Sequence, residues 1–169
     1  MTTDTLTPDQ VDLLKRWQRG TRLLQVAHIL SANSTHRLNR LFGISVVILT
    51  TIVGTSIFAS IDAKIAVGML SMAAAVVSSL QLFLRHDDVV LRHKQAFAQY
   101  GQLRREIEQY LACPPSTPTE FCTVVKSLRT RWDDTDREAP PLRQRIHDKA
   151  IKQIAEHDAK RAKDIAPTP

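Results

Sequence analysis

The chain has 169 residues, of which 43% are hydrophobic and 24% are charged, and its mean hydropathy of -0.17 is that of an ordinary globular domain. Its two cysteines, Cys113 and Cys122, exclude a disulfide framework and a zinc site built on cysteine pairs. The net charge of +6 arises from basic residues interleaved with 17 acidic ones, so we expect anionic lipid headgroups, and no nucleic acid, as their partner.

Residues 1–8 are rich in threonine and are expected to be flexible, and the first helix is predicted over residues 9–40. Thr7 is suited to cap this helix, Pro8 to occupy its first position and Gln10 to complete a capping box. Residues recurring every three or four positions then predict one buried face. This face consists of Leu14, Trp17, Thr21, Leu24, His28 and Ser31. We expect the helix to continue into the apolar segment that follows.

Two uncharged runs, residues 41–61 and 65–84, are separated only by Asp62, Ala63 and Lys64. A helix of about 20 residues is roughly 30 Å long, which is the thickness of the hydrocarbon core of a bilayer. We therefore predict two transmembrane helices in a tight hairpin. The first inserts more readily because it holds more large apolar residues. The alternative, two buried helices of a soluble bundle, is disfavoured because so small a protein has little with which to cover them.

Basic residues flank both runs on the side away from the turn, whereas the turn itself has only Lys64 beside Asp62. Because positive charge collects on the cytoplasmic side, this pattern predicts a multi-pass protein with both termini in the cytoplasm. The flanking residues are Arg22, Arg37, Arg40, Arg85, Arg92, Lys94 and Arg104.

Each run contains small and polar residues at a spacing that places them on the same face of a helix. In the first run Thr51 and Thr55 share a face, and Thr50 and Gly54 share the next one. Such a stripe either lines a water path between subunits or packs closely against another helix, and packing is its commoner use. Neither run has a charge in its middle, which argues against a proton-coupled transporter and a voltage sensor. The stripe of the second run is Ser71, Ala74, Ser78, Gln81 and Arg85.

The next helix is predicted over residues 85–112, and we expect it to pack antiparallel to the helix of residues 9–40. Its apolar face has coiled-coil-like spacing and consists of His93, Ala96, Tyr100, Leu103, Ile107 and Tyr110. We expect the cytoplasmic helices to supply contacts for assembly, and the candidates are Trp17, Leu24, Tyr100, Leu103 and Ile107.

Two amphipathic helices are predicted over residues 118–133 and 141–160, followed by a disordered tail of residues 161–169. Thr117 is suited to cap the first, with Pro118 at its first position and Glu120 completing a capping box. Their apolar faces are Phe121, Val124, Val125, Leu128 and Trp132 in the first, and Leu142, Ile146, Ala150, Ile151 and Ile154 in the second.

The sequence contains no glycine-rich phosphate loop and no His-Glu-x-x-His motif, so we predict neither an enzyme nor a cofactor. The histidines near the predicted membrane boundary are expected to be solvated or to pack between helices; these are His28, His36, His86 and His93. Basic residues of the last two helices are candidates to bind an anionic nucleotide, with a solvated helix face as the alternative. They are Arg129, Arg131, Arg143, Arg145 and Lys149.

Five features of the sequence, taken in chain order, resemble those of a known family. They are Leu13, Leu14 and Trp17, the stretch from His36 to Gly43, two runs with a minimal turn, Tyr100 and Leu103 on a long helix, and Ala139, Pro140, Pro141 and Leu142. In this order and spacing, over about residues 10 to 157, the chain resembles the SLATT domain. SLATT proteins are bacterial two-transmembrane effectors named for their association with nucleotide-synthesising SMODS and nucleotide-sensing SLOG domains.

We therefore predict an all-α fold, with residues 9–157 as a SLATT-like domain. The resemblance implies an inner-membrane effector that perturbs the membrane or forms a pore in nucleotide-signalled conflict systems, including defence against phage. It implies as partner a nucleotide second messenger or a separately encoded protein that makes or senses one. We expect a homo-oligomer, because one hairpin has too few helices to enclose a water path. The alternative is a non-conducting scaffold whose hairpin anchors helices that bind a partner protein.

Overall fold

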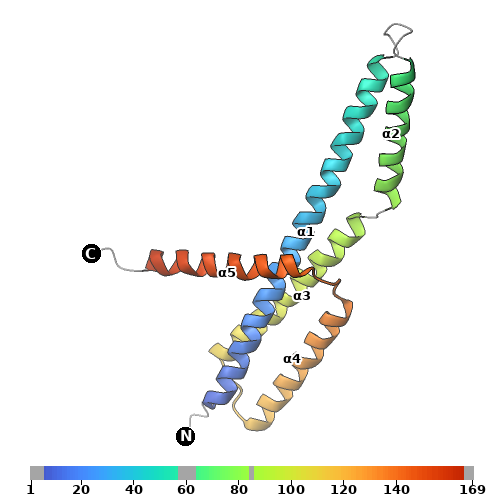
Figure 1. Cartoon of the computed structure of the whole chain (residues 1–169). Coiled ribbons are helices and arrows are strands. Elements are labelled where there is room, and N and C mark those ends of the chain that lie inside the picture. The colour runs from blue at the N-terminus through green and yellow to red at the C-terminus, as the bar shows by residue number, and fades with distance from the viewer. Residues whose placement is uncertain (1–5, 57–63, 84–85, 166–169) are drawn as a thin grey trace. The chain divides into compact units, whose positions relative to one another are not determined.

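The computed structural model describes residues 6–56, 64–83 and 86–165. Over these ranges the chain is helical with short connections and contains no strand, which confirms the predicted all-α class. The helices, labelled in Figure 1, are α1 (Pro8–Ser56), α2 (Lys64–Phe83), α3 (His86–Ala112), α4 (Pro118–Glu138) and α5 (Gln144–Ile165).

The helices differ from the predicted ranges mainly at their ends. α1 runs without a break through residue 40 into the first uncharged run. α4 continues past residue 133 to Glu138, and α5 starts at Gln144 and runs on to Ile165, past the predicted start of the tail at residue 161. The predicted turn at Asp62 and Ala63 lies outside the described residues.

Two helix starts have the capping chemistry that the sequence indicates. At α1, the Thr7 backbone N–H donates to Gln10 Oε1 at 2.9 Å, and the Gln10 N–H donates to Thr7 Oγ1 at 3.4 Å. At α4, the Glu120 N–H donates to Thr117 Oγ1 at 3.2 Å, but the Glu120 carboxylate accepts from the N–H of Ser116 rather than of Thr117. Each arrangement satisfies backbone donors that a helix start leaves free.

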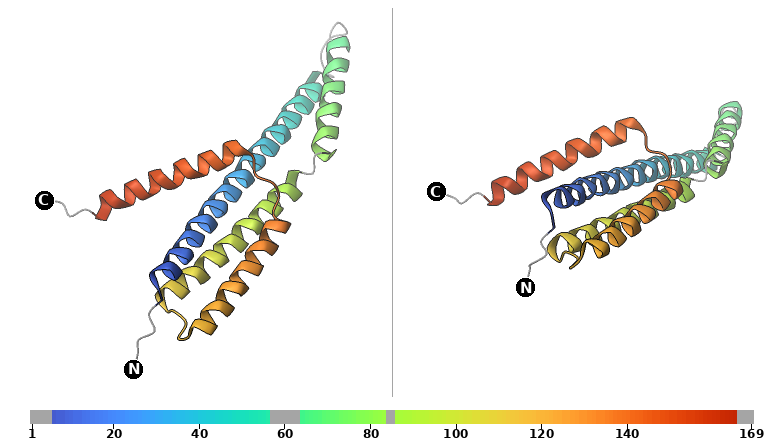
Figure 2. Two further views of the ribbon diagram at one scale, coloured as in Figure 1. Left: turned by 60° about the horizontal axis from the view of Figure 1, so that its bottom comes forward. Right: turned by 90° about the horizontal axis from the view of Figure 1, so that it is seen from below.

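The chain divides into two compact units. The first unit consists of Met1–Ser31 and Arg92–Pro169, and the second of Ala32–Leu91. In the first unit α3 packs antiparallel to α1, because Gln18 bonds to Glu108 at one end of the pair and His28 meets His93 at the other. α4 in turn runs antiparallel to α3, and Figure 2 shows the three helices side by side.

The core of the first unit lies where α1, α3 and α4 face one another. Trp17 and Trp132 meet edge to face with ring centroids 6.0 Å apart, which joins α1 to α4. Gly20 allows this approach, since a Cβ atom there would lie 2.8 Å from the Trp132 ring. The buried apolar residues of this core are Leu14, Ala96, Tyr100, Leu103, Ile107, Phe121 and Leu128.

α5 is linked to α1 by an ion pair and contributes one buried residue to the first unit. Ala150 is its buried residue, and Asp158 receives two hydrogen bonds from the Arg22 guanidinium, at 2.6 and 2.9 Å. Residues 155–165 are all exposed. In Figure 2 the C-terminal part of α5 extends away from the other helices of the first unit.

The second unit contains α1 from Ala32 onward, α2 and the first turn of α3. α2 lies beside this part of α1 (Figure 1), and Ala74 is its buried residue. The Asn39 amide donates to the Asp87 carboxylate at 2.9 Å, which ties α1 to α3 within this unit. In the described ranges, no helix combines the length and the apolar character that a membrane crossing needs.

Candidate functional site

Large apolar side chains cover the outside of the second unit. Ile65 is 80% exposed, and Met69 and Met72 are each 71% exposed. Exposed apolar patches on a folded protein are usually contact sites for another protein or for lipid. The further exposed residues of this surface are Leu38, Leu41, Ile44, Val47, Ile48, Ile52, Val76, Val89 and Leu91.

Hydroxyl groups on this surface are satisfied by their own helix. Thr51 Oγ1 donates to the Val47 carbonyl oxygen at 2.8 Å, and Ser71 Oγ donates to that of Val67 at 2.8 Å. A hydroxyl bonded to the carbonyl one turn earlier has less need of water, so it can face an apolar phase at low cost. Ser45, Thr50 and Ser79 bond backward in the same way.

The residues predicted to line a pore or a helix seam are only partly described. Thr51, Ser71 and Ser78 are exposed. Ala74, which belongs to the same predicted stripe on α2, is instead buried. The side chains of Thr55 and Gln81 and the whole of Arg85 lie outside the described residues. Within one chain the structure therefore turns part of this stripe inward and leaves the two serines available to a neighbour.

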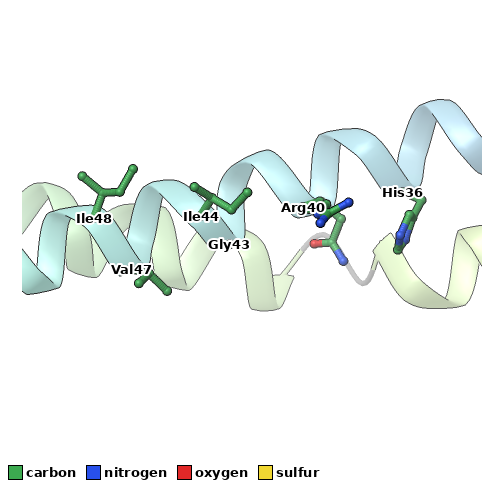
Figure 3. Close-up of a pocket in the computed structure, with 7 residues that line it drawn as sticks. His36, Arg40, Gly43, Ile44, Val47 and Ile48 are labelled. Carbon is green, nitrogen blue, oxygen red and sulfur yellow. The ribbon is translucent and has the colours of Figure 1, made fainter.

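An open groove of about 530 Å³ follows α1 in the second unit. Figure 3 shows Ile44, Val47 and Ile48 at one end and Arg40 and His36 on the preceding turns. The groove is thus apolar along one stretch and cationic beyond it. Its remaining lining residues are Asn39 and Gly43. All of these residues belong to α1, and the sequence indicated the charge of this region but not the groove.

A buried polar cluster joins the three core helices of the first unit. His28 Nδ1 of α1 lies 3.0 Å from His93 Nδ1 of α3, and the His28 ring stacks on the Tyr100 ring with centroids 5.4 Å apart. The Tyr100 hydroxyl donates to the carboxylate of Asp136 on α4. The same carboxylate accepts from the Trp132 indole N–H at 3.1 Å. The helix-packing role considered for these two histidines is the one the structure gives them.

Burial determines the charge state of this cluster. Loss of hydration, followed by the neighbouring His93, lowers the pKa of His28 to about 4. Burial also lowers the pKa of His93. Burial and the bond to Asp136 raise the pKa of Tyr100. At neutral pH both imidazoles are therefore uncharged and the phenol is protonated. Among the described residues, no three side chains of histidine, cysteine, aspartate or glutamate converge as a metal site.

The residues predicted for assembly lie inside the first unit. Tyr100, Leu103 and Ile107 are buried in its core, and Trp17 and Leu24 are partly buried against it. Their packing partners are helices of their own chain. A role of these residues in assembly between copies stays a prediction.

The basic residues predicted to bind a nucleotide fall into two groups. Arg129 pairs with Asp133 at 3.1 Å, and Arg131 pairs with Glu106. Arg143, Arg145 and Lys149, at the start of α5 and just before it, are exposed. Only this second group offers cationic groups without a paired carboxylate among the described contacts.

Comparison with protein-family models, with curated proteins and with solved structures finds no match to this chain.

Proposed function

We propose that the chain is a SLATT-like membrane effector whose second unit inserts into the bacterial inner membrane as a two-helix hairpin. The observation that carries this proposal is the apolar outer surface of the second unit, exemplified by Ile65, Met69 and Met72. Removing a large apolar side chain from water is worth about 1.5–3 kcal/mol. A dozen such residues at the surface therefore offer a large gain in free energy to lipid or to another protein that covers them.

The sequence supports a bilayer as the phase that covers this surface. The uncharged runs of residues 41–61 and 65–84 extend beyond the described ends of α1 at Ser56 and α2 at Phe83. The exposed hydroxyls bonded to their own helix carbonyls also suit an environment without water. The basic residues on both flanks favour an orientation in which the first unit and both termini are cytoplasmic.

Permeabilisation requires several copies, because the two helices of one hairpin cannot enclose a water path. Ser71 and Ser78 on α2 and Thr51 on α1 are exposed members of the predicted stripes, and in this proposal they line such a path or the seam between copies. A path of this kind is weakly polar and is gated by its apolar residues. The trigger in this proposal is a nucleotide, or a separately encoded protein that makes or senses one, and it acts on the cytoplasmic helices.

Leakage from liposomes tests the proposal. The purified full chain is reconstituted into liposomes that contain a self-quenched dye, and single-channel currents are recorded in planar bilayers. We expect dye release, and we expect Ser71→Leu with Ser78→Leu to reduce it while Ser116→Leu, in the turn before α4, leaves it unchanged. Tight vesicles with inserted protein, with and without cyclic and linear oligonucleotides, would contradict the pore.

A non-conducting scaffold is the second candidate, and the satisfied hydroxyls favour it. Because Thr51 and Ser71 already bond to their own helix, this surface can contact lipid or a second helix without any water path. Replacing residues 41–84 with an unrelated hairpin discriminates between the candidates. A scaffold keeps its cellular activity after this exchange, whereas a pore loses it.

A further inference from the structure

The contact between His28 and His93 admits only certain protonation states. Their Nδ1 atoms are 3.0 Å apart, and the side chains are 1% and 5% exposed. At that distance one Nδ1 must carry a hydrogen and the other must offer its lone pair. In the neutral pair the donor ring is therefore protonated at Nδ1 and the acceptor ring at Nε2.

Successive protons affect this bond differently. A first extra proton adds to Nε2 of the donor ring, and the Nδ1–H···Nδ1 bond survives with a positive charge on the donor. A second extra proton must add to Nδ1 of the acceptor. Both facing nitrogens then carry hydrogens, and two like charges lie in contact in a buried site. Doubly protonated, the pair has to separate.

The groups described around the pair do not balance this positive charge. On α3, Tyr100 stacks on His28 through its ring face, and the exposed Arg92 and Lys94 add positive charge on either side of His93. The carboxylate attached to the cluster is Asp136 on α4, but it is occupied by the Tyr100 hydroxyl and the Trp132 indole.

Charged groups on the other helices of the first unit are also engaged with other residues. Glu138 of α4 bonds to Gln99 at 3.4 Å. On α5, Asp158 is paired with Arg22, which lies earlier on α1 than the histidine pair. His147 of α5 is half-buried, and its Nδ1 has no hydrogen-bond partner among the described residues. An imidazole is neutral or positively charged, so it cannot balance the charge of the pair.

We propose that His28 and His93 form an acid-sensitive latch that closes α1 on α3 at this end of their contact at neutral pH and opens when both rings are protonated. The latch belongs to the first unit and does not depend on the proposed membrane function. Both helices continue along the chain from this point into the second unit, α1 after Ser31 and α3 before Arg92. Release of the latch thus loosens the segments that lead to the hairpin, where the bond between Asn39 and Asp87 is the next described link between α1 and α3.

The pKa values give the direction and the pH window. The pKa of His28 falls from 6.5 to about 4 on folding, so the unfolded chain binds more protons between these values. Stability is therefore complete above pH 6.5 and is lost as the pH falls towards 4. For this one group the linkage amounts to a decrease of about 100-fold in the folding equilibrium constant between pH 7 and pH 4.

The bond itself can be observed by NMR on the full chain, labelled with 15N at histidine and held in detergent micelles. We expect a 15N–15N coupling across the Nδ1–H···Nδ1 bond at pH 7.5. It should be lost reversibly as the pH falls from 6 towards 4. Absence of the coupling at pH 7.5, or an unweakened coupling at pH 4, would overturn the proposal.

Unfolding as a function of pH provides a second measurement. The double variant His28→Gln with His93→Gln keeps a hydrogen-bonding pair that does not titrate, and His157→Gln removes an exposed histidine as a matched control. We expect the double variant to lose much of the acid dependence between pH 6.5 and pH 4, and the control to retain it. An unchanged acid dependence in a folded double variant would contradict the latch, and if the variant does not fold the NMR result on the natural sequence decides.

Discussion

The two units of this molecule treat large apolar side chains in opposite ways. In the first unit Leu103 is 1% exposed, at the centre of a core that α1, α3 and α4 close among themselves. In the second unit Met72 is 71% exposed on the outside of α2. One chain thus contains a unit whose apolar side chains bury one another and a unit whose apolar surface stays exposed unless lipid or another protein covers it.

The difference follows from the pattern of the residues rather than from their number. In the helices of the first unit, apolar residues recur every three or four positions and leave a polar face for water. In residues 41–61 and 65–84, apolar residues cover most of the helix circumference outside the small and polar stripes, so that no rotation of either helix can bury them against a single partner. A hairpin of two such helices remains apolar outside, whatever its internal packing.

Truncating a leucine in each unit should give the largest contrast. Leu103→Ala leaves a cavity in a closed core and should lower the free energy of unfolding by about 2–5 kcal/mol. Leu41→Ala removes an exposed side chain and should change it by less than about 0.5 kcal/mol. Denaturation of the full chain followed by far-ultraviolet circular dichroism measures both, because both units are helical. Equal losses for the two variants would remove the distinction between the units.

A charge introduced into the second unit should disfavour membrane insertion. The change in free energy should be similar to the loss of folding stability when a core residue is truncated. Met72→Lys places an ammonium group in the middle of α2 and should disfavour insertion by about 2.5–3.5 kcal/mol. Flotation of the full chain with liposomes measures the effect as a smaller membrane-bound fraction. Ile151→Lys, which adds the same charge at an exposed position of α5, is the control and should float like the natural sequence.

Replacing Gly20 or Gly101 of the first unit with alanine should change the stability of that unit in opposite directions. Gly20→Ala drives a Cβ into the rigid Trp132 ring at 2.8 Å and should destabilise the first unit by about 1–3 kcal/mol. Gly101→Ala meets the amide end of Gln25 and, at 3.5 Å, the guanidinium of Arg105, which are both ends of flexible side chains, so the gain in helix propensity of up to about 1 kcal/mol should prevail. Thermal melts of the two variants compare them directly, and a stabilising Gly20→Ala would show that α1 and α4 are not in close contact.

The smallest effect should come from the hydrogen bond between Tyr100 and Asp136. Tyr100→Phe keeps the ring that stacks on His28 and removes only the hydroxyl, so the free energy of unfolding should fall by about 1 kcal/mol. Asp136→Ala also leaves the Trp132 indole N–H without its acceptor and should cost more. The same denaturation assay checks the order, and a greater loss for Tyr100→Phe would contradict the assigned role of Asp136.

Periodicity and capping residues predicted much of the first unit. The stripe that includes Leu14, Thr21 and His28 is buried as expected, and Thr7 and Thr117 cap the helices assigned to them. These features depend on neighbours within one or two turns of the same helix, and such neighbours can be identified from sequence spacing alone.

Contacts between helices were not predictable in the same way. The faces that contain His28 and His93 were recognised, but their direct bond depends on the axial register of α1 against α3, which spacing within each helix does not specify. The bonds from Tyr100 and Trp132 to Asp136 were missed for the same reason. Asp136 lies beyond residue 133, the predicted end of this helix, so the sequence did not place it on a helix face.

The central claim, that lipid covers the outer surface of the second unit, is tested most directly by the depth of a spin label. Cys113 and Cys122 are exposed and can be replaced by serine, after which a single label is attached through Met72→Cys or, as a comparison, Ile151→Cys. Power saturation in reconstituted liposomes then compares access of oxygen, which is concentrated in the bilayer, with access of a water-soluble nickel complex. The account predicts that oxygen dominates at position 72 and nickel at position 151. Dominance of nickel at both positions would contradict it.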